Sequence, residues 1–192
     1  MGPLILGLVI FLGVHSLGMA APAWRERTIA RLGEVPWKGL YSVASLVGFV
    51  LIVWGYGLAR QEPVALWVPP TWLRHVALLV MLPAFPLLLA AYLPGRIQTA
   101  AKHPMLAAVK LWAFAHLLAN GNLADVILFG SFLAWAVADR ISLRGRTPPP
   151  VHMAPPGKAN DAIAVIGGLI LYGAFIGIVH AWLFGVSPLG VR

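Results

Sequence analysis

Long stretches without charged side chains constrain this chain more than any other feature of its sequence. Residues 1–22 contain no Asp, Glu, Lys or Arg, and residues 162–185 contain none either. A transmembrane helix needs about 20 predominantly apolar residues to cross about 30 Å of hydrocarbon. With 60% hydrophobic and only 10% charged residues among 192, the chain has more apolar surface than a soluble domain of this size can bury. The sequence therefore predicts an integral membrane protein.

Six apolar stretches predict an all-α, polytopic membrane helix bundle, and we expect residues 1–192 to form a single domain. The six predicted transmembrane helices are 1–22, 37–59, 72–93, 104–120, 123–138 and 162–185. The fourth and fifth are short, and Asn120-Gly121-Asn122 between them is a tight-turn signal, which predicts a hairpin. Two thin or tilted spans, or a re-entrant hairpin that does not cross, would both satisfy these lengths.

Basic residues are concentrated in alternate loops. The first, third and fifth loops carry Arg25, Arg27, Arg31, Lys38, Arg96, Lys102, Arg140, Arg144, Arg146 and Lys158, whereas the opposite side carries Arg60, Arg74 and Arg192. The positive-inside rule then predicts a multi-pass protein of the bacterial inner (plasma) membrane with both termini outside the cytoplasm. The net charge of +8 is explained by these loops, so we expect no nucleic-acid partner. No Lys or Arg precedes the first apolar run, which favours a retained helix over a cleaved signal peptide.

Ionisable residues within the predicted spans are the candidates for chemistry, because they are costly in a membrane. They are His15, His75, Lys110, His116, Asp125 and His180. Counting along the spans places His75 and His180 near the outer surface, and His15 and His116 in the middle third. No two histidines are three or four residues apart and there is no cysteine, which excludes the common zinc and di-iron patterns. A cofactor that needs one or two imidazoles remains, and haem b fits that requirement; histidines that only brace neighbouring helices are the alternative.

The residues around His116 suit a large flat cofactor. Trp112 and Asn120 lie four residues before and after it, on the same helical face. Lys110 and His103, with Lys102, cluster toward the cytoplasmic end. These groups are expected to pair with haem propionates, or with lipid phosphates as the alternative.

Several motifs in order along the chain carry a family resemblance. They are His15-Ser16-Leu17-Gly18, Trp37-Lys38-Gly39-Leu40-Tyr41-Ser42, Lys102-His103-Pro104-Met105-Leu106, Leu111-Trp112-Ala113-Phe114-Ala115-His116, Ala119-Asn120-Gly121-Asn122-Leu123, Leu128-Phe129-Gly130 and His180-Ala181-Trp182-Leu183-Phe184-Gly185. With these motifs the chain resembles the NnrU family and, more distantly, the membrane zeta-carotene isomerases of plants and cyanobacteria. The Lys102-His103-Pro104 stretch also faintly resembles membrane isoprenylcysteine methyltransferases, but no glutamate follows it.

The resemblance implies a function in denitrification, through the activity or expression of nitrite and nitric oxide reductases. The isomerases hold haem b through two histidines, and the matching positions are His15 and His116, which implies bis-histidine ligation of the iron. A cysteine that takes part in ligand exchange in the isomerases is replaced here by Ala113, which puts isomerase activity in doubt. Two alternatives stay open, a haem-dependent cis–trans isomerase of a polyene lipid and a non-catalytic accessory or assembly subunit. The expected partners are membrane lipid, a hydrophobic substrate or NO, and a membrane protein complex.

Overall fold

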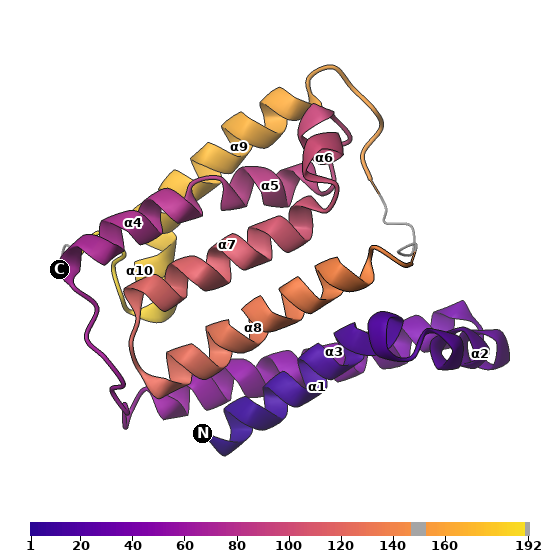
Figure 1. Cartoon of the computed structure of the whole chain (residues 1–192), viewed down its shortest axis with the longest axis horizontal. Helices are drawn as coiled ribbons and strands as arrows, with labels where there is room; N and C mark the ends of the chain where they lie inside the picture. The colour runs from indigo at the N-terminus through magenta and orange to yellow at the C-terminus, as the bar shows by residue number, and fades with distance from the viewer. Residues whose placement is uncertain (147–152, 191–192) are drawn as a thin grey trace. The chain divides into compact units, whose positions relative to one another are not determined.

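The computed structural model describes residues 1–146 and 153–190, and helices are its main elements (Figure 1). Contacts divide the chain into two compact units, Met1–Trp67 with Gly121–Pro148 and Val68–Asn120 with Pro149–Arg192. The first unit holds α1 (Gly2–Ala20), α2 (Pro22–Leu32), α3 (Glu34–Ala59) and α8 (Leu123–Ser142). The second holds α4 (Thr71–Met81), α5 (Ala84–Ala90), α6 (Arg96–Ala101), α7 (Pro104–Ala119), α9 (Asn160–Ala174), the π-helix η1 (Phe175–Val179) and α10 (His180–Phe184).

In the first unit α1 packs along α3 through glycines that bring the two backbones close together. A Cβ atom added at Gly48 would lie 2.7 Å from the Phe11 nitrogen, and one added at Gly7 would lie 2.6 Å from the Ile52 nitrogen. Small residues allow this approach in membrane helices, where close van der Waals packing replaces the hydrophobic effect as the main attraction. This close packing places the α3 side chains that face α1 in contact with the side chains of α1.

Hydrogen bonds join the segment that follows α3 to the start of α8. The Leu123 N–H donates to the Val64 carbonyl at 2.8 Å, and the Leu66 N–H donates to the Gly121 carbonyl at 2.8 Å. Asn122 and Asp125 form a reciprocal capping box at the first turn of α8. The Tyr56 hydroxyl donates to the Asp125 carboxylate at 2.5 Å. Asn120 and Asn122 have an extended backbone instead of the expected tight turn, with an isolated bridge between Asn122 and Ala65. The cap of the helix that follows, α8, is held from α3.

In the second unit α5 packs against α7 and α9, and α4 packs against α7. The Tyr172 hydroxyl of α9 donates to the Leu78 carbonyl of α4 at 2.9 Å. The Asp161 carboxylate at the start of α9 accepts the Arg96 N–H at 2.9 Å and the Ile97 N–H at 3.0 Å. Both α7 and α9 therefore begin near α6, and both run back along the α4–α5 segment.

Six transmembrane helices are not confirmed. In the described residues four helical segments are long and apolar enough to cross a membrane, Gly2–Ala20, Glu34–Ala59, Thr71–Ala90 and Asn160–Phe184. The fourth predicted span is α7, an apolar helix below that length. The fifth is longer than expected, because α8 continues past its apolar part through Asp139 and Arg140. The length and apolar composition of these four helices indicate a membrane protein.

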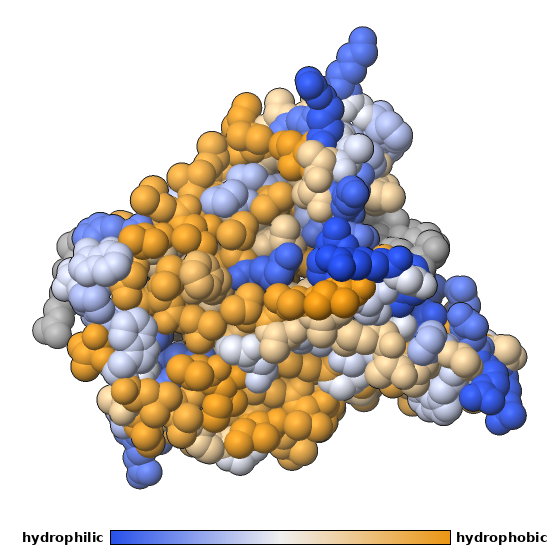
Figure 2. Space-filling model, viewed as in Figure 1, coloured by the Kyte–Doolittle hydropathy of each residue, from blue (hydrophilic) through white to orange (hydrophobic). Residues whose placement is uncertain are grey.

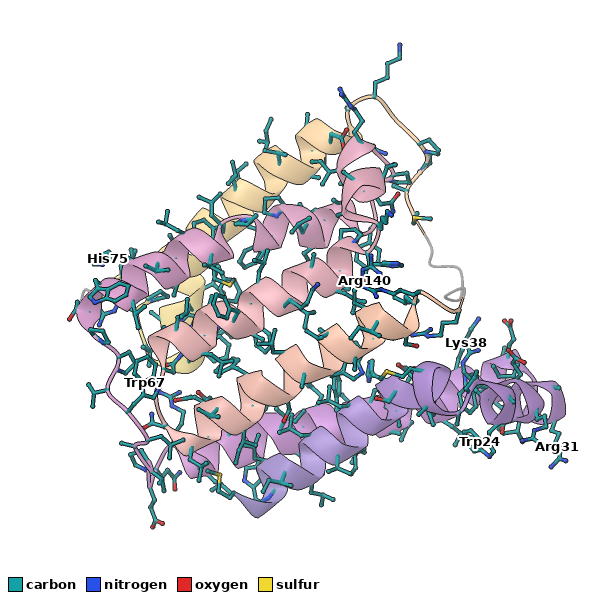
Figure 3. All side chains as sticks on the ribbon, viewed as in Figure 1. Trp24, Arg31, Lys38, Trp67, His75 and Arg140 are labelled. Atoms are coloured by element: carbon teal, nitrogen blue, oxygen red, sulfur yellow. The ribbon has the colours of Figure 1, made fainter. Side chains whose placement is uncertain are left out.

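One helix was not expected from the sequence. In the first loop, α2 carries Arg25, Arg27 and Arg31, and it has no buried residue. Its Trp24 ring meets the Trp37 ring edge-on at 6.0 Å, and Trp24 and Arg31 can be located on it in Figure 3. On the face drawn in Figure 2, apolar residues cover much of the long helices, while hydrophilic residues gather at α2 and near α6. Aromatic and basic residues on one short helix are typical of a helix at a membrane interface.

Candidate functional site

His15 lies on α1 among aromatic rings from three helices of the first unit. Its ring stacks on the Phe11 ring with centroids 4.2 Å apart and an interplanar angle of 26°. The Tyr41 ring of α3 is 5.3 Å away and the Trp135 ring of α8 is 6.1 Å away, edge-on. The His15 Nδ1 atom is 2.7 Å from the Phe11 carbonyl oxygen. The imidazole is thus half-buried and held in one orientation.

Two buried polar atoms of the first unit lack a hydrogen-bond partner among the described residues. They are the indole Nε1 of Trp135 and the hydroxyl of Ser45. Trp135 contacts the His15 ring, and Ser45 follows Tyr41 by one turn of α3. Buried donors are normally satisfied, since an unpaired one costs about 1–3 kcal/mol. A ligand or water beside His15 would satisfy them, so this observation favours a bound group at that place.

His116 lies in the last turn of α7. Its Nδ1 atom is 2.8 Å from the Trp112 carbonyl oxygen, and the Trp112 ring is 5.4 Å from its own ring. The Asn120 side-chain amide donates to the His116 carbonyl at 2.9 Å, which caps the end of the helix. The structure therefore places Trp112 and Asn120 beside His116, as the spacing predicts. Ala113 and Ala115 on the same helix are almost completely buried.

The Nδ1 contacts fix which nitrogen of each ring can bind a metal. A backbone carbonyl oxygen only accepts hydrogen bonds, so the nitrogen facing it carries the proton. In the neutral ring, the lone pair then belongs to Nε2. Metal-bound histidines commonly have this arrangement, with the second ring nitrogen donating to a carbonyl. His15 and His116 are both in the tautomer that a metal ligand needs.

His103 and Lys110 are not brought together with His116. His103 is the residue before α7, so the rise of about 1.5 Å per residue separates it from His116 by roughly 20 Å along the helix. Lys110 lies between them, six residues before His116. His116 itself lies nearer a helix end than the middle third that we expected, because α7 stops at Ala119. The assignment of His103 and Lys110 to the cofactor stays a prediction.

His180, which counting along the spans places near the outer surface, lies close to His116. Its ring lies 6.3 Å from the His116 ring, with an interplanar angle of 26°. Its Nδ1 atom is 2.7 Å from the Val186 carbonyl oxygen, so it has the same tautomer as the other two histidines. Counting along the predicted spans did not find this pair, because it placed His116 in the middle third, whereas α7 ends at Ala119 and His116 lies in its last turn.

A comparison with known protein families shows to which family the chain belongs. The family model described as NnrU protein matches residues 3–188. The chain belongs to the NnrU family. No curated protein and no solved structure matches it, so the more distant relation to zeta-carotene isomerases stays a prediction. In this NnrU-family chain His15 belongs to the first unit and His116 to the second, and the pairing of these two histidines also stays a prediction.

Proposed function

We propose that this NnrU-family protein is an integral membrane protein that binds haem b and serves nitrogen-oxide metabolism in the bacterial inner membrane. His116 is proposed as one residue that would hold the haem iron, and His15 is the second, as the family resemblance implies. When bound, haem b would supply an iron centre able to bind NO or carry an electron. The link to nitrite and nitric oxide reduction comes from the family resemblance.

The observation that carries this proposal is the shared tautomer of the histidines. Each Nδ1–H donates to a carbonyl oxygen one helical turn earlier in the chain. His15 donates to the Phe11 carbonyl, and His116 donates to the Trp112 carbonyl. In each neutral ring the lone pair then belongs to Nε2, the atom through which a histidine with this hydrogen bond commonly binds a metal. Haem needs only two such ligands because the porphyrin supplies four nitrogens. The unpaired Trp135 N–H beside His15 gives further support.

The proposal is tested by the absorption spectrum of protein purified in mild detergent. We expect the α and Soret bands of haem b in the reduced-minus-oxidised spectrum of the wild type. His116→Ala should lose them, because it removes a ligand. His75→Ala is the matched control: His75 is exposed at the start of α4 (Figure 3) and should leave the spectrum unchanged. Wild-type protein without haem, or a His116→Ala spectrum identical to wild type, contradicts the proposal.

The two other functions predict different results with the same material. A polyene isomerase would convert a cis-polyene when loaded with haem under reducing conditions. An accessory subunit would purify with a respiratory complex and without haem. No observation in the described residues favours the isomerase or the accessory subunit over haem binding.

A further inference from the structure

The helix α2 is held at the membrane surface by its connections at both ends. One residue, Ala21, separates it from α1, and one residue, Gly33, separates it from α3. Both α1 and α3 are long and apolar enough to cross a membrane. With 11 residues α2 extends over only about 16 Å, so it stays close to the level at which its two neighbours leave the hydrocarbon. Its side chains therefore lie at the depth of the lipid headgroups.

One face of α2 combines an aromatic ring with two arginines. Arg27, Thr28 and Arg31 follow Trp24 by three, four and seven residues, which places all four on one side of the helix. They line a surface hollow of about 230 Å³, and Trp24 and Arg31 can be followed along α2 in Figure 3. The Trp24 side chain is 48% exposed, and the Trp37 ring of α3 meets it edge-on. The hollow thus has an aromatic wall and two cationic side chains.

The positive charge of this face is not neutralised by the neighbouring acidic residues. Glu26 is five residues before Arg31, so the two point roughly 140° apart around the helix axis. The Glu34 carboxylate forms its salt bridge with Lys38, at 3.0 Å. Among the described residues, Arg27 and Arg31 form no salt bridge. Both guanidinium groups are therefore available to an anion from outside the chain.

An anionic phospholipid supplies the groups that this face fits. Guanidinium groups bind phosphate oxygens through paired hydrogen bonds, and tryptophan rings are enriched at the boundary between headgroups and acyl chains. The Arg27 Nε–H donates to the Ala23 carbonyl at 3.2 Å, which leaves its two terminal amino groups for a phosphate. A soluble phosphate compound would have to compete at this depth with the phosphates of the surrounding lipid, so lipid is the favoured ligand.

We propose that the hollow on α2 binds the headgroup phosphate of an anionic phospholipid. Arg27 and Arg31 donate to the phosphodiester oxygens, and Trp24 lies against the glycerol and the upper part of an acyl chain. The site belongs to the first unit. It requires neither haem nor any of the histidines, so it is independent of the proposed function.

The test measures which lipid collects beside α2. Ala30→Cys, at an exposed residue outside the hollow, gives a single attachment point for a fluorophore because the chain contains no cysteine. The labelled protein is placed in phosphatidylcholine nanodiscs that contain either nitroxide-labelled phosphatidylglycerol or nitroxide-labelled phosphatidylcholine. Phosphatidylglycerol should halve the fluorescence at about a 20-fold lower mole fraction, since each basic residue near the surface favours an anionic lipid by about fivefold.

Three single substitutions separate the site from a general attraction to positive charge. Arg27→Gln and Arg31→Gln should each reduce the preference for phosphatidylglycerol about fivefold. Arg25→Gln is the matched control, because it removes the same charge from the same helix at a residue that does not line the hollow. It removes only a longer-range attraction, which physiological salt screens, and should reduce the preference much less.

The possible outcomes are distinct. Equal quenching by the two labelled lipids in the wild type overturns the proposal. Equal effects of all three substitutions also overturn it, because the attraction would then come from the overall charge of α2. The absence of quenching by either lipid would place α2 away from the membrane and favour a soluble partner. A protein without haem would contradict the proposed function and leave this test unaffected.

Discussion

Individual glycines set the distance between α1 and α3. At Gly55 an added Cβ would lie 2.7 Å from the Leu4 Cα, whereas at Gly57, half a turn away, it would meet nothing within 4 Å. Leu4 is fully buried, so the neighbouring backbone has no space to retreat. The two glycines of one helix therefore differ only in what they face.

Gly55→Ala should lower the free energy of unfolding by about 1–3 kcal/mol, the usual cost of overpacking. Gly57→Ala should leave it unchanged or raise it by up to about 1 kcal/mol, because alanine is the better helix former. Unfolding in mixed detergent–SDS micelles, followed by circular dichroism, measures both. Equal effects of the two substitutions would mean that α1 and α3 do not pack through Gly55.

The Tyr56–Asp125 hydrogen bond is a second residue-scale feature with a measurable consequence. Asp125 is only 3% exposed, and its other carboxylate oxygen accepts from the Asn122 backbone and side chain. Tyr56→Phe removes one donor from a buried acceptor, which should cost about 1–3 kcal/mol of stability. Tyr92→Phe, at a residue that is 45% exposed, should cost almost nothing. A Tyr56→Phe protein as stable as wild type would show that the Tyr56–Asp125 hydrogen bond does not contribute to stability.

Most of the long helices could be predicted from the sequence, and one short helix could not. Apolar length predicted α1, α3, the α4–α5 segment and the α9–α10 segment, because burial in lipid imposes a length on any helix that crosses it. It did not predict α2, whose basic and aromatic residues resemble a polar loop in composition. It placed Trp112 and Asn120 beside His116 through helical spacing alone. It missed the proximity of the His116 and His180 rings, because α7 ends at Ala119 and His116 therefore lies near a helix end instead of in the middle third of a span.

For the molecule as a whole, the predicted orientation in the membrane can be measured directly. The chain contains no cysteine, so single cysteines can be introduced without background. Glu62→Cys, in the loop between α3 and α4, should react with a membrane-impermeant maleimide in intact cells. Arg31→Cys on α2 should react only after permeabilisation, because the basic loops are predicted to be cytoplasmic. The reverse labelling pattern would invert the orientation, and labelling of both in intact cells would contradict a cytoplasmic α2.

The central claim is that two imidazoles of this membrane protein hold the iron of a protohaem. Chemical extraction of the pigment from the purified wild-type protein, with quantification as the pyridine haemochrome, tests it most directly. The account predicts protohaem in near-stoichiometric amount with the chain. A protein that stays free of pigment, even when cells are supplied with excess haem precursor, would contradict it.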